Sequence, residues 1–225
     1  MVIDNVNRTL KDDLALELQK GSKLSIVAAD FSMYAFEALR KELSEIDELR
    51  FIFTDPTFIQ KENSKKEKRE FYIPKINRER RIYGTEFEVK LRNELNQKAI
   101  AKECAEWIKK KVTFKSNVGN KEIINRFIVL NDIAYYQVNS FTTVDLGCEQ
   151  GNTMDVNIFK MESPMSQVLI EQFAKLWQND EELKDVTNNV ISSISSAYNE
   201  NAPEFIYFVT LYNIFHEFLT DISED

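Results

Sequence analysis

The sequence predicts an α/β fold in which a mixed β-sheet is flanked by helices on both faces and followed by a C-terminal helical extension. Short apolar segments of strand length alternate with amphipathic helical segments along the chain, as expected of β-α-β units. The 225 residues include five glycines and four prolines, so long regular elements are favoured. This length suits one large domain or one domain with an appendage.

The N-terminal elements predict one β-α-β unit. Thr9 can cap a helix over residues 9–19, because its hydroxyl accepts a hydrogen bond from the first turn. Residues 23–29 form a compact apolar segment that is typical of a buried strand. A second helix, capped by Ser32, leads to a second strand over residues 49–54. The right-handed crossover implies that these two strands are parallel.

The middle of the chain predicts an insertion, a long helix and several strands. Residues 57–85 have no clear period and are interpreted as an insertion at the sheet edge. A long helix over residues 87–111 carries Cys104 on its apolar face, where a buried core thiol is expected. Asn131 and Asp132 predict the two-residue turn of a hairpin. The further strand candidates are residues 112–115, 126–130, 133–138 and 154–159.

The C-terminal part is predicted to be helical, with helices over residues 163–179, 180–199 and 202–219. Pro164 is expected at the first position of the first of these helices. We therefore divide the chain into an α/β domain, residues 1–180, and a helical extension, residues 181–225. The last helix is apolar nearly all round, so we expect it to pack against a partner or against a further part of a longer chain.

Charge is distributed unevenly along the sequence. The formal net charge is −8, yet residues 61–81 contain nine basic and four acidic residues, a local net charge of +5. Residues 171–225 contain eleven acidic and two basic residues, a local net charge of −9. A basic segment can attract phosphate groups, although a solvated loop is the alternative interpretation. The acidic segment is expected to face protein or solvent.

Motif searches exclude several classes of enzyme. The sequence has no P-loop, no Gly-x-Gly-x-x-Gly and no Gly-x-Ser-x-Gly, which argues against the common nucleotide-binding and hydrolase sites. Cys104, Cys148 and His216 supply too few ligands for a metal site, so neither a metal nor a cofactor is expected here. No apolar run reaches the roughly 18 to 20 residues that cross a bilayer, and no secretory signal is evident. We therefore expect a cytoplasmic protein.

The predicted hairpin resembles the phospholipase D-like superfamily. Residues 125–142 read as strand, tight turn and strand, followed by Asn-Ser-Phe-Thr and then Leu-Gly. That family carries His-x-Lys-x-x-x-x-Asp on such a hairpin, and the three motif positions fall on Asn125, Phe127 and Asp132 of this sequence. Only the aspartate is kept. Since the histidine acts as nucleophile or acid and the lysine holds the phosphate, the resemblance implies a catalytically degenerate domain without catalytic residues.

A second resemblance concerns the surroundings of this domain. Residues 3–10, 24–43 and 207–215 are similar to the region that precedes the ATPase core in large bacterial superfamily 2 helicases of the Swi/Snf type. This resemblance implies an N-terminal fragment of an ATP-dependent DNA helicase, a hydrolase whose ATP and Mg sites lie in a core beyond residue 225. The helix over residues 202–219 would then pack on that core.

Three functions follow as hypotheses. The first is a non-catalytic accessory module that binds DNA weakly. Its candidate phosphate-binding residues are Lys65, Lys66, Lys68, Arg69, Arg78, Arg80, Arg81, Asn125, Asn139, Ser140 and Thr142. The second is an active nuclease or phosphodiesterase that uses His216. The third is a structural interaction domain, a possible homodimer with Phe127 and Tyr135 at the interface; ordinary strand core is the alternative for these two residues.

Overall fold

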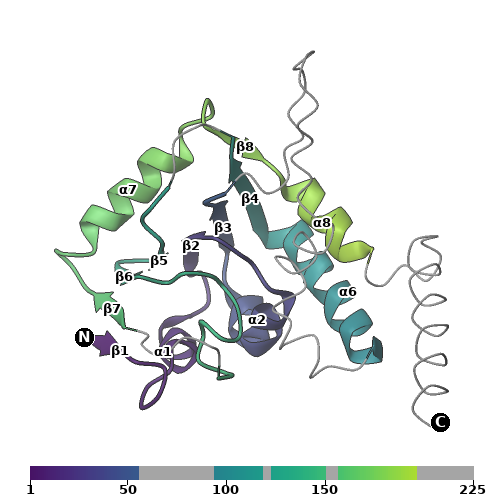
Figure 1. The fold of residues 1–225 in the computed structure, drawn as a ribbon, viewed down its shortest axis with the longest axis horizontal. Helices are drawn as coiled ribbons and strands as arrows, with labels where there is room; N and C mark the ends of the chain where they lie inside the picture. Colours follow the sequence, from purple (N-terminus) through teal and green to yellow (C-terminus); the bar gives the residue numbers. More distant parts are fainter. Residues whose placement is uncertain (56–93, 119–122, 151–156, 197–225) are drawn as a thin grey trace, which may run out of the picture.

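The computed structural model describes residues 1–55, 94–118, 123–150 and 157–196, which form a mixed sheet with helices on both faces (Figure 1). Eight strands are hydrogen-bonded in the order β1-β7-β6-β5-β2-β3-β4-β8. The strands are β1 (Val2–Ile3), β2 (Lys23–Ala28), β3 (Glu48–Phe53), β4 (Val112–Asn117), β5 (Phe127–Leu130), β6 (Ile133–Tyr136), β7 (Ile158–Met161) and β8 (Leu183–Asp185). The helices are α1 (Leu10–Glu17), α2 (Met33–Ala38), α3 (Arg40–Glu45), α6 (Glu94–Lys111), α7 (Gln167–Trp177) and α8 (Thr187–Ser195). The predicted fold class is confirmed.

The parallel part of the sheet is the β-α-β unit that the sequence predicts. β2 pairs with β3 in parallel, and β3 pairs with β4 in parallel. β5, β6 and β7 continue the sheet on the other side of β2 with antiparallel pairing. Because β5 runs against β2, the start of β5 lies beside the C-terminal end of β2, where Val27 is paired with Phe127. Several chain segments therefore meet at this edge of the sheet.

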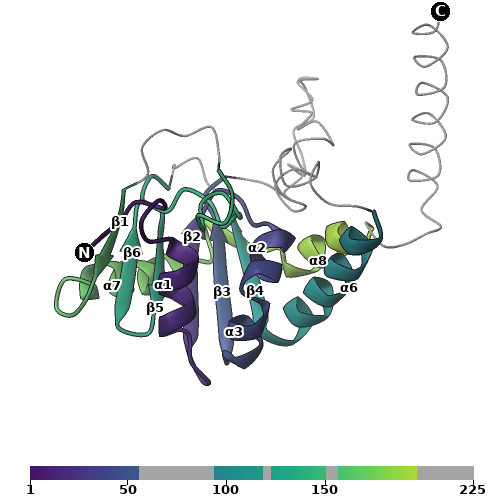
Figure 2. The same ribbon diagram turned by 90° about the horizontal axis from the view of Figure 1, so that it is seen from below.

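Two hydrophobic clusters hold the layers together. One lies between the sheet and the helices α1, α2, α3, α6 and α8, and the other lies under α7 on the opposite face (Figure 2). In the first cluster the rings of Phe51 and Phe53 lie 4.7 Å apart, and Phe114 lies 5.4 Å from Phe51. Phe173 of α7 is buried in the second cluster, where the guanidinium of Arg50 lies 5.1 Å from its ring centre. Such contacts bury apolar area on both faces of the sheet.

The hairpin is confirmed as β5, a turn at residues 131–132, and β6. Asn131 has φ of 52°, in the left-handed region that asparagine tolerates. Its side-chain oxygen also accepts a hydrogen bond of 3.1 Å from the backbone N–H of Lys23. The turn residue therefore links the hairpin to the first residue of β2. Cys104 is buried as predicted, and burial raises the pKa of its thiol far above the ordinary value.

Some boundaries differ from those that the sequence predicts. Leu39 leaves the helical conformation, with φ of −117°, so the second predicted helix is divided into α2 and α3. The strand predicted over residues 154–159 continues to Met161 in β7, whose described residues are Ile158–Met161; residues 154–156 lie outside the described part of the chain. Pro164 follows a cis peptide bond and precedes α7, which begins at Gln167, so the expectation of Pro164 at the first helical position was wrong.

The region after residue 180 does not begin as a separate helical extension. β8 pairs antiparallel with β4, with Lys115 opposite Asp185. Val190 and Ile194 of α8 are buried in the same cluster as the other helices on that face. Residues 183–195 therefore belong to the sheet and its core, which corrects the helix predicted over residues 180–199. The insertion 57–85, the helix 202–219 and His216 lie outside the described residues. No described helix is long and apolar enough to span a membrane.

Candidate functional site

Two adjoining pockets lie where β5 begins, at the edge formed by the C-terminal ends of the parallel strands. The first, which we call the hairpin pocket, has a volume of about 400 Å³ and lies between the start of β5, the end of β6 and the start of β7. The second, the amide pocket, has a volume of about 380 Å³ and lies between α7 and the end of β4. Ile124 and Asn125 line both pockets. In α/β sheets, ligands commonly bind at this carboxyl edge.

The hairpin pocket is lined by neutral polar side chains together with apolar and charged ones. Asn125 and Arg126 come from the segment before β5, Gln137 and Asn139 from the segment after β6, and Asn157 from the residue before β7. The backbone N–H of Gln137 donates to the carbonyl of Arg126 at 3.1 Å, so the hairpin pairing continues past the strands. This pairing brings the two sets of side chains to one place.

Among the described residues that line the hairpin pocket, Arg126 is the cation. Its side chain is half-buried, and its buried Nε has no hydrogen-bond partner in the described part of the chain. A buried donor without a partner costs about 1–3 kcal/mol, and more when the group is charged. The guanidinium has five donors arranged in a fork that matches phosphate and carboxylate oxygens. Arg126 is therefore placed to bind an anion.

Asp145 brings an opposing negative charge to the same pocket. Its carboxylate accepts a hydrogen bond of 2.6 Å from the hydroxyl of Thr142, and its carbonyl accepts one of 2.8 Å from the side chain of Asn5. Gly147 holds this loop with φ of 76°, and a Cβ there would lie 2.8 Å from Asn5. The loop is thus fixed. Because Asp145 repels anions, an anionic group fits on the Arg126 side of the pocket.

The structure brings together two of the four loop residues predicted to bind phosphate. Asn125 and Asn139 both line the hairpin pocket. Ser140 and Thr142 are buried, and their hydroxyls donate to the carboxylates of Asp30 and Asp145 at 3.0 and 2.6 Å. Ser140 and Thr142 therefore stabilise the loop instead of facing a ligand. This corrects the phosphate-binding role that the sequence suggested for them.

The three family motif positions do not form one site in this chain. Asn125 lines the pockets, and its side-chain oxygen accepts a hydrogen bond of 3.3 Å from the hydroxyl of Tyr136. Phe127 is fully buried in the cluster under α7. Asp132 lies in the turn at the other end of β5, where its carbonyl accepts a hydrogen bond from Ser166. Asn125 and Asp132 are therefore separated by the length of the hairpin.

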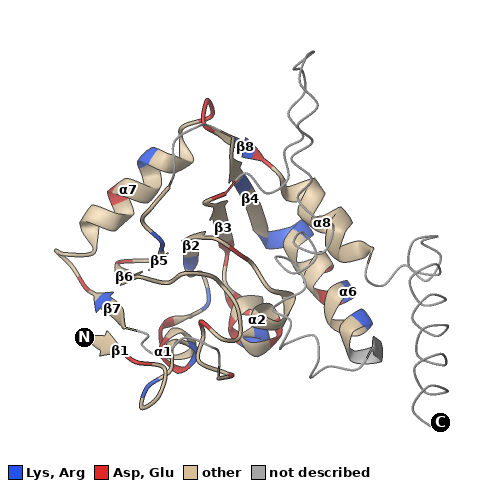
Figure 3. Cartoon of the chain, in the orientation of Figure 1, with Lys and Arg blue, Asp and Glu red and all other residues tan. Residues whose placement is uncertain are grey.

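The other predicted residues have different outcomes. The candidate DNA-binding residues Lys65, Lys66, Lys68, Arg69, Arg78, Arg80 and Arg81 lie outside the described residues. Phe127 and Tyr135 are fully buried within the domain, which agrees with ordinary strand core, the alternative considered for these two residues. Over the described part, basic and acidic residues are interspersed, with a run of lysines over residues 109–111 at the end of α6 (Figure 3). Among these described residues, no cluster of histidine, cysteine, aspartate or glutamate is suited to a metal ion.

Sequence reasoning missed Arg126 and the amides of Gln137, Asn157 and Gln172. Arg126 offered one signal, since it directly precedes the four buried apolar residues of β5. A charged residue at the start of a buried strand needs a polar environment. The amides gave no such signal because exposed glutamine and asparagine are common on any surface.

A buried ionic cluster lies elsewhere, between α1 and the strands β6 and β7. The ammonium of Lys160 lies 2.7 Å from Asp13 and 2.6 Å from Glu17, and the hydroxyl of Tyr135 donates to Asp13 at 2.8 Å. Arg8 also contacts Asp13. Burial opposes the charge of Asp13, but hydrogen bonds from Lys160 and Tyr135 outweigh it and lower the pKa of this carboxyl. Burial and the bond to Asp13 raise the pKa of Tyr135. Lys160, Tyr135 and Arg8 all contact Asp13, so the cluster holds α1 against the sheet.

Comparison with known proteins supports the fold. No known protein family model and no curated protein sequence matches the chain. Among solved structures, phosphatidylserine synthase from Haemophilus influenzae matches with a TM-score of 0.50 and 9% identity, over 90% of this chain and 43% of the synthase. Nuc from Salmonella typhimurium, a phospholipase D family member, matches with a TM-score of 0.42 and 10% identity, over 78% of this chain and 87% of Nuc.

These similarities concern the fold and not the activity. The chain spans less than half of the synthase, and identities near a tenth carry no residue roles from one protein to the other. The mixed eight-stranded sheet, with α7 on one face and the other described helices on the opposite face, is nevertheless the arrangement that the hairpin resemblance implied. The chain has a phospholipase D-like α/β fold.

Proposed function

We propose that this chain is a non-catalytic phospholipase D-like module that binds phosphate groups of nucleic acid in the hairpin pocket. The observation that carries the proposal is Arg126, a half-buried guanidinium whose Nε has no partner in the described part of the chain. The surrounding amides of Asn125, Gln137, Asn139 and Asn157 supply neutral donors for further phosphate oxygens.

The chemistry of the pocket favours binding over cleavage. Phosphodiester transfer in this fold class needs a nucleophile and a proton donor of suitable pKa. The described residues of the hairpin pocket include neither histidine nor lysine. Its carboxylate, Asp145, accepts a hydrogen bond from Thr142, and its phenol, Tyr136, donates one to Asn125, so both groups are engaged within the protein. Amide side chains neither attack phosphorus nor exchange a proton near neutral pH. A phosphate held by Arg126 would therefore remain intact.

The setting of this module is the second part of the proposal. The similarity of residues 3–10, 24–43 and 207–215 to the region before a Swi/Snf-type core supports an accessory role in an ATP-dependent DNA helicase. The net charge of −8 repels DNA, so the affinity of the module alone is weak and falls with salt. In a longer natural protein, deleting residues 1–196 should lower DNA-stimulated ATPase activity and leave basal ATPase activity intact.

An active phosphodiesterase is the competing function. It is favoured by the structural similarity to an enzyme, phosphatidylserine synthase, and its histidine would be His216. Turnover of a generic phosphodiester by the purified chain, lost in His216→Ala, would establish this function. We expect no turnover.

The proposed function is tested by the affinity for a labelled single-stranded oligonucleotide, measured by fluorescence polarisation. A hydrogen bond to a charged group contributes about 1.5–3 kcal/mol, so Arg126→Gln should raise the Kd by about tenfold or more. Arg40→Gln is the matched control, because Arg40 is exposed on α3 and pairs with Glu103. Unchanged binding by Arg126→Gln, or an equal loss in Arg40→Gln, would refute the role of the hairpin pocket.

A further inference from the structure

The amide pocket is a second, differently built cavity beside Arg126. Its volume of about 380 Å³ lies within the range of about 300–1,000 Å³ that is typical of small-molecule sites. It opens between α7 and the sheet, and it shares Ile124 and Asn125 with the hairpin pocket. A ligand that places one group at Arg126 can therefore extend past Asn125 into this second cavity.

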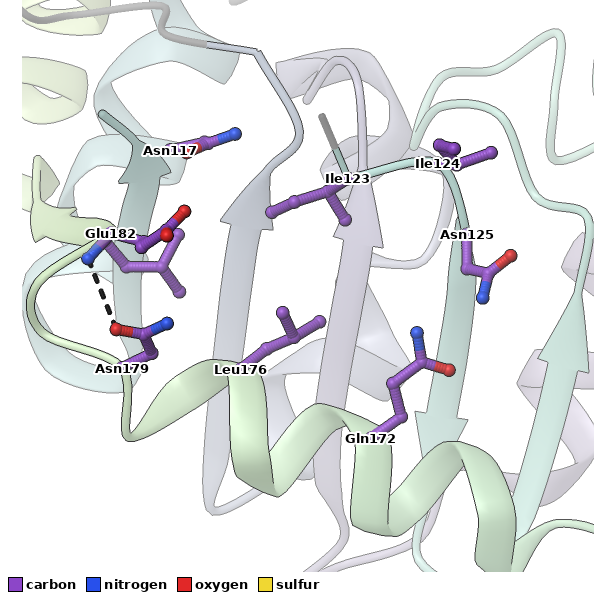
Figure 4. Close-up of a pocket in the computed structure, with 9 residues that line it drawn as sticks. Asn117, Ile123, Ile124, Asn125, Gln172, Leu176, Asn179 and Glu182 are labelled. Atoms are coloured by element: carbon purple, nitrogen blue, oxygen red, sulfur yellow. Dashed lines mark hydrogen bonds between the residues drawn. The ribbon is translucent and has the colours of Figure 1, made fainter. Parts of the chain in front are cut away.

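Among the described residues, the amide pocket is lined by apolar side chains, by four amides and by one carboxylate, that of Glu182, which directly precedes β8. Ile123 and Leu176 face one another across the cavity from the segment before β5 and from α7 (Figure 4). Leu183 closes the pocket at β8 and is 2% exposed. The side chains of Gln172 and Asn125 point toward each other across the opening (Figure 4). Such a pocket suits a flat, apolar ring with polar groups at its edge.

The amides of Gln172 and Asn125 are available for a ligand. Gln172 makes no side-chain hydrogen bond within the part of the chain that the structure describes, and Asn125 uses only its oxygen, which accepts from Tyr136. An amide places a donor and an acceptor side by side, the pattern that pairs with the edge of a nucleobase. Asn179 adds another amide, although its oxygen already accepts from the backbone N–H of Glu182.

We propose that the amide pocket holds one nucleobase of a single-stranded nucleic acid whose adjacent phosphate lies at Arg126. This inference rests on the proposed function and names the class of nucleic acid. Ile123 and Leu176 would cover the faces of the base, and Gln172 and Asn125 would bond its edge. Bases in a duplex are stacked and paired, so a base must leave the stack to enter such a pocket. Single strands offer such bases without that cost.

A phospholipid is the alternative source of a phosphate next to an apolar group. An acyl chain in the amide pocket would cover Gln172 and Asn125 without bonding them, and burying unbonded amides costs free energy. The amide lining therefore favours a base over an acyl chain. Anionic phospholipid vesicles serve as a competitor in the test below.

The test compares a short single strand, an abasic strand of the same length and charge, and a blunt duplex. We expect the base-containing strand to bind about tenfold tighter than the abasic strand, as one to two bonded base contacts imply. Gln172→Met keeps the length of the side chain and removes the amide, so the two strands should then bind within about twofold of each other. Gln167→Leu, an exposed change on the same helix outside the pocket, should leave the difference intact.

The outcomes separate this inference from the proposed function. Equal binding of the two strands by the unmodified chain, with Arg126 still required, would overturn the base site and leave the phosphate site standing. If Arg126→Gln binds the abasic strand as tightly as the unmodified chain does, the proposed function is overturned instead. Displacement of the single strand by vesicles but not by duplex would assign the site to a lipid headgroup. If Gln172→Met proves unfolded, thymidine is added to the unmodified chain and the NMR signals of the Ile123 and Leu176 methyl groups are followed. A shift of these signals would support the base site, and no shift would refute it.

Discussion

Replacing Lys160 by methionine should destabilise the protein by about 3–5 kcal/mol, the usual result when one partner of a buried ion pair is removed. Lys160 is 7% exposed at its side chain and Asp13 is fully buried, so the change removes the buried cation that lies beside the Asp13 carboxylate. Arg8 remains in contact but is 44% exposed, so water screens its charge. Tyr135 still donates its hydroxyl, which offsets part of the loss.

The measurement is equilibrium unfolding in urea, with the free energy extrapolated to zero denaturant. For a chain of this size, about 1 kcal/mol corresponds to about 2–4 °C in Tm, so a thermal scan should show a fall of roughly 6 to 20 °C. The double variant Asp13→Leu with Lys160→Met removes both charges and should recover most of the stability. A loss below about 1 kcal/mol in the single variant would show that the pair is effectively solvated and would refute the reasoning.

The same cluster predicts a pH dependence of the free energy of unfolding. The folded-state pKa of Asp13 is lowered, so its contribution is present above the ordinary carboxyl pKa of 3.8 and is lost as pH falls through the folded value. The folded-state pKa of Lys160 is raised by Asp13 and Glu17, against the opposing effect of burial. Its contribution is present below 10.5 and is lost as pH rises through the folded value. The difference between the natural chain and Lys160→Met should thus be largest between about pH 5 and 9 and should shrink at both extremes.

Three further predictions concern a loop, a thiol and the basic segment. Gly147→Ala should cost about 1–3 kcal/mol in urea unfolding, because φ of 76° and a Cβ 2.8 Å from Asn5 both oppose a side chain; a neutral result would mean that the loop can move. Cys148 is exposed, whereas Cys104 is buried with a raised pKa. A thiol reagent should therefore label Cys148 quickly and Cys104 only on unfolding; rapid labelling of both cysteines in the folded protein would contradict this. Serine at all seven basic positions of the segment 61–81 should weaken DNA binding and reduce its dependence on salt. If this variant is retained on DNA as well as the unmodified chain, the segment does not bind DNA. These positions are Lys65, Lys66, Lys68, Arg69, Arg78, Arg80 and Arg81.

The sequence correctly predicted elements that depend mainly on residues close to one another in the chain. The helix capped by Thr9 and the hairpin with its turn at Asn131 each depend on residues close in sequence, and both are confirmed. β1 and β8 were missed because each is two or three residues long and exists through a distant partner. Val2 is paired with Phe159, and Asp185 with Lys115. No local pattern carries that information.

The candidate site was predictable to the extent that one hairpin forms it. Asn125 and Asn139 flank the hairpin, so its pairing alone brings them together. Gln172 reaches the site from α7, and Asn157 from the start of β7. Their positions depend on how α7 packs and how β7 pairs, which a motif cannot express. The hairpin thus accounts for Asn125 and Asn139 lying together, but not for the other residues that line the two pockets.

Lys160 and Arg126 have different surroundings, which indicates a structural role for Lys160 and a binding role for Arg126. Lys160 lies between two carboxylates and is satisfied, so its charge contributes to holding α1 on the sheet. Arg126 lines a pocket with several neutral amides and the Asp145 carboxylate, and its buried Nε lacks a partner within the described residues, so burial of this group opposes stability. Groups that lower stability are expected where a ligand supplies the missing partner. Accordingly, Arg126→Met should keep or raise the free energy of unfolding while phosphate binding falls, whereas Lys160→Met should lower the free energy of unfolding; a comparable loss of stability in both variants would remove this distinction.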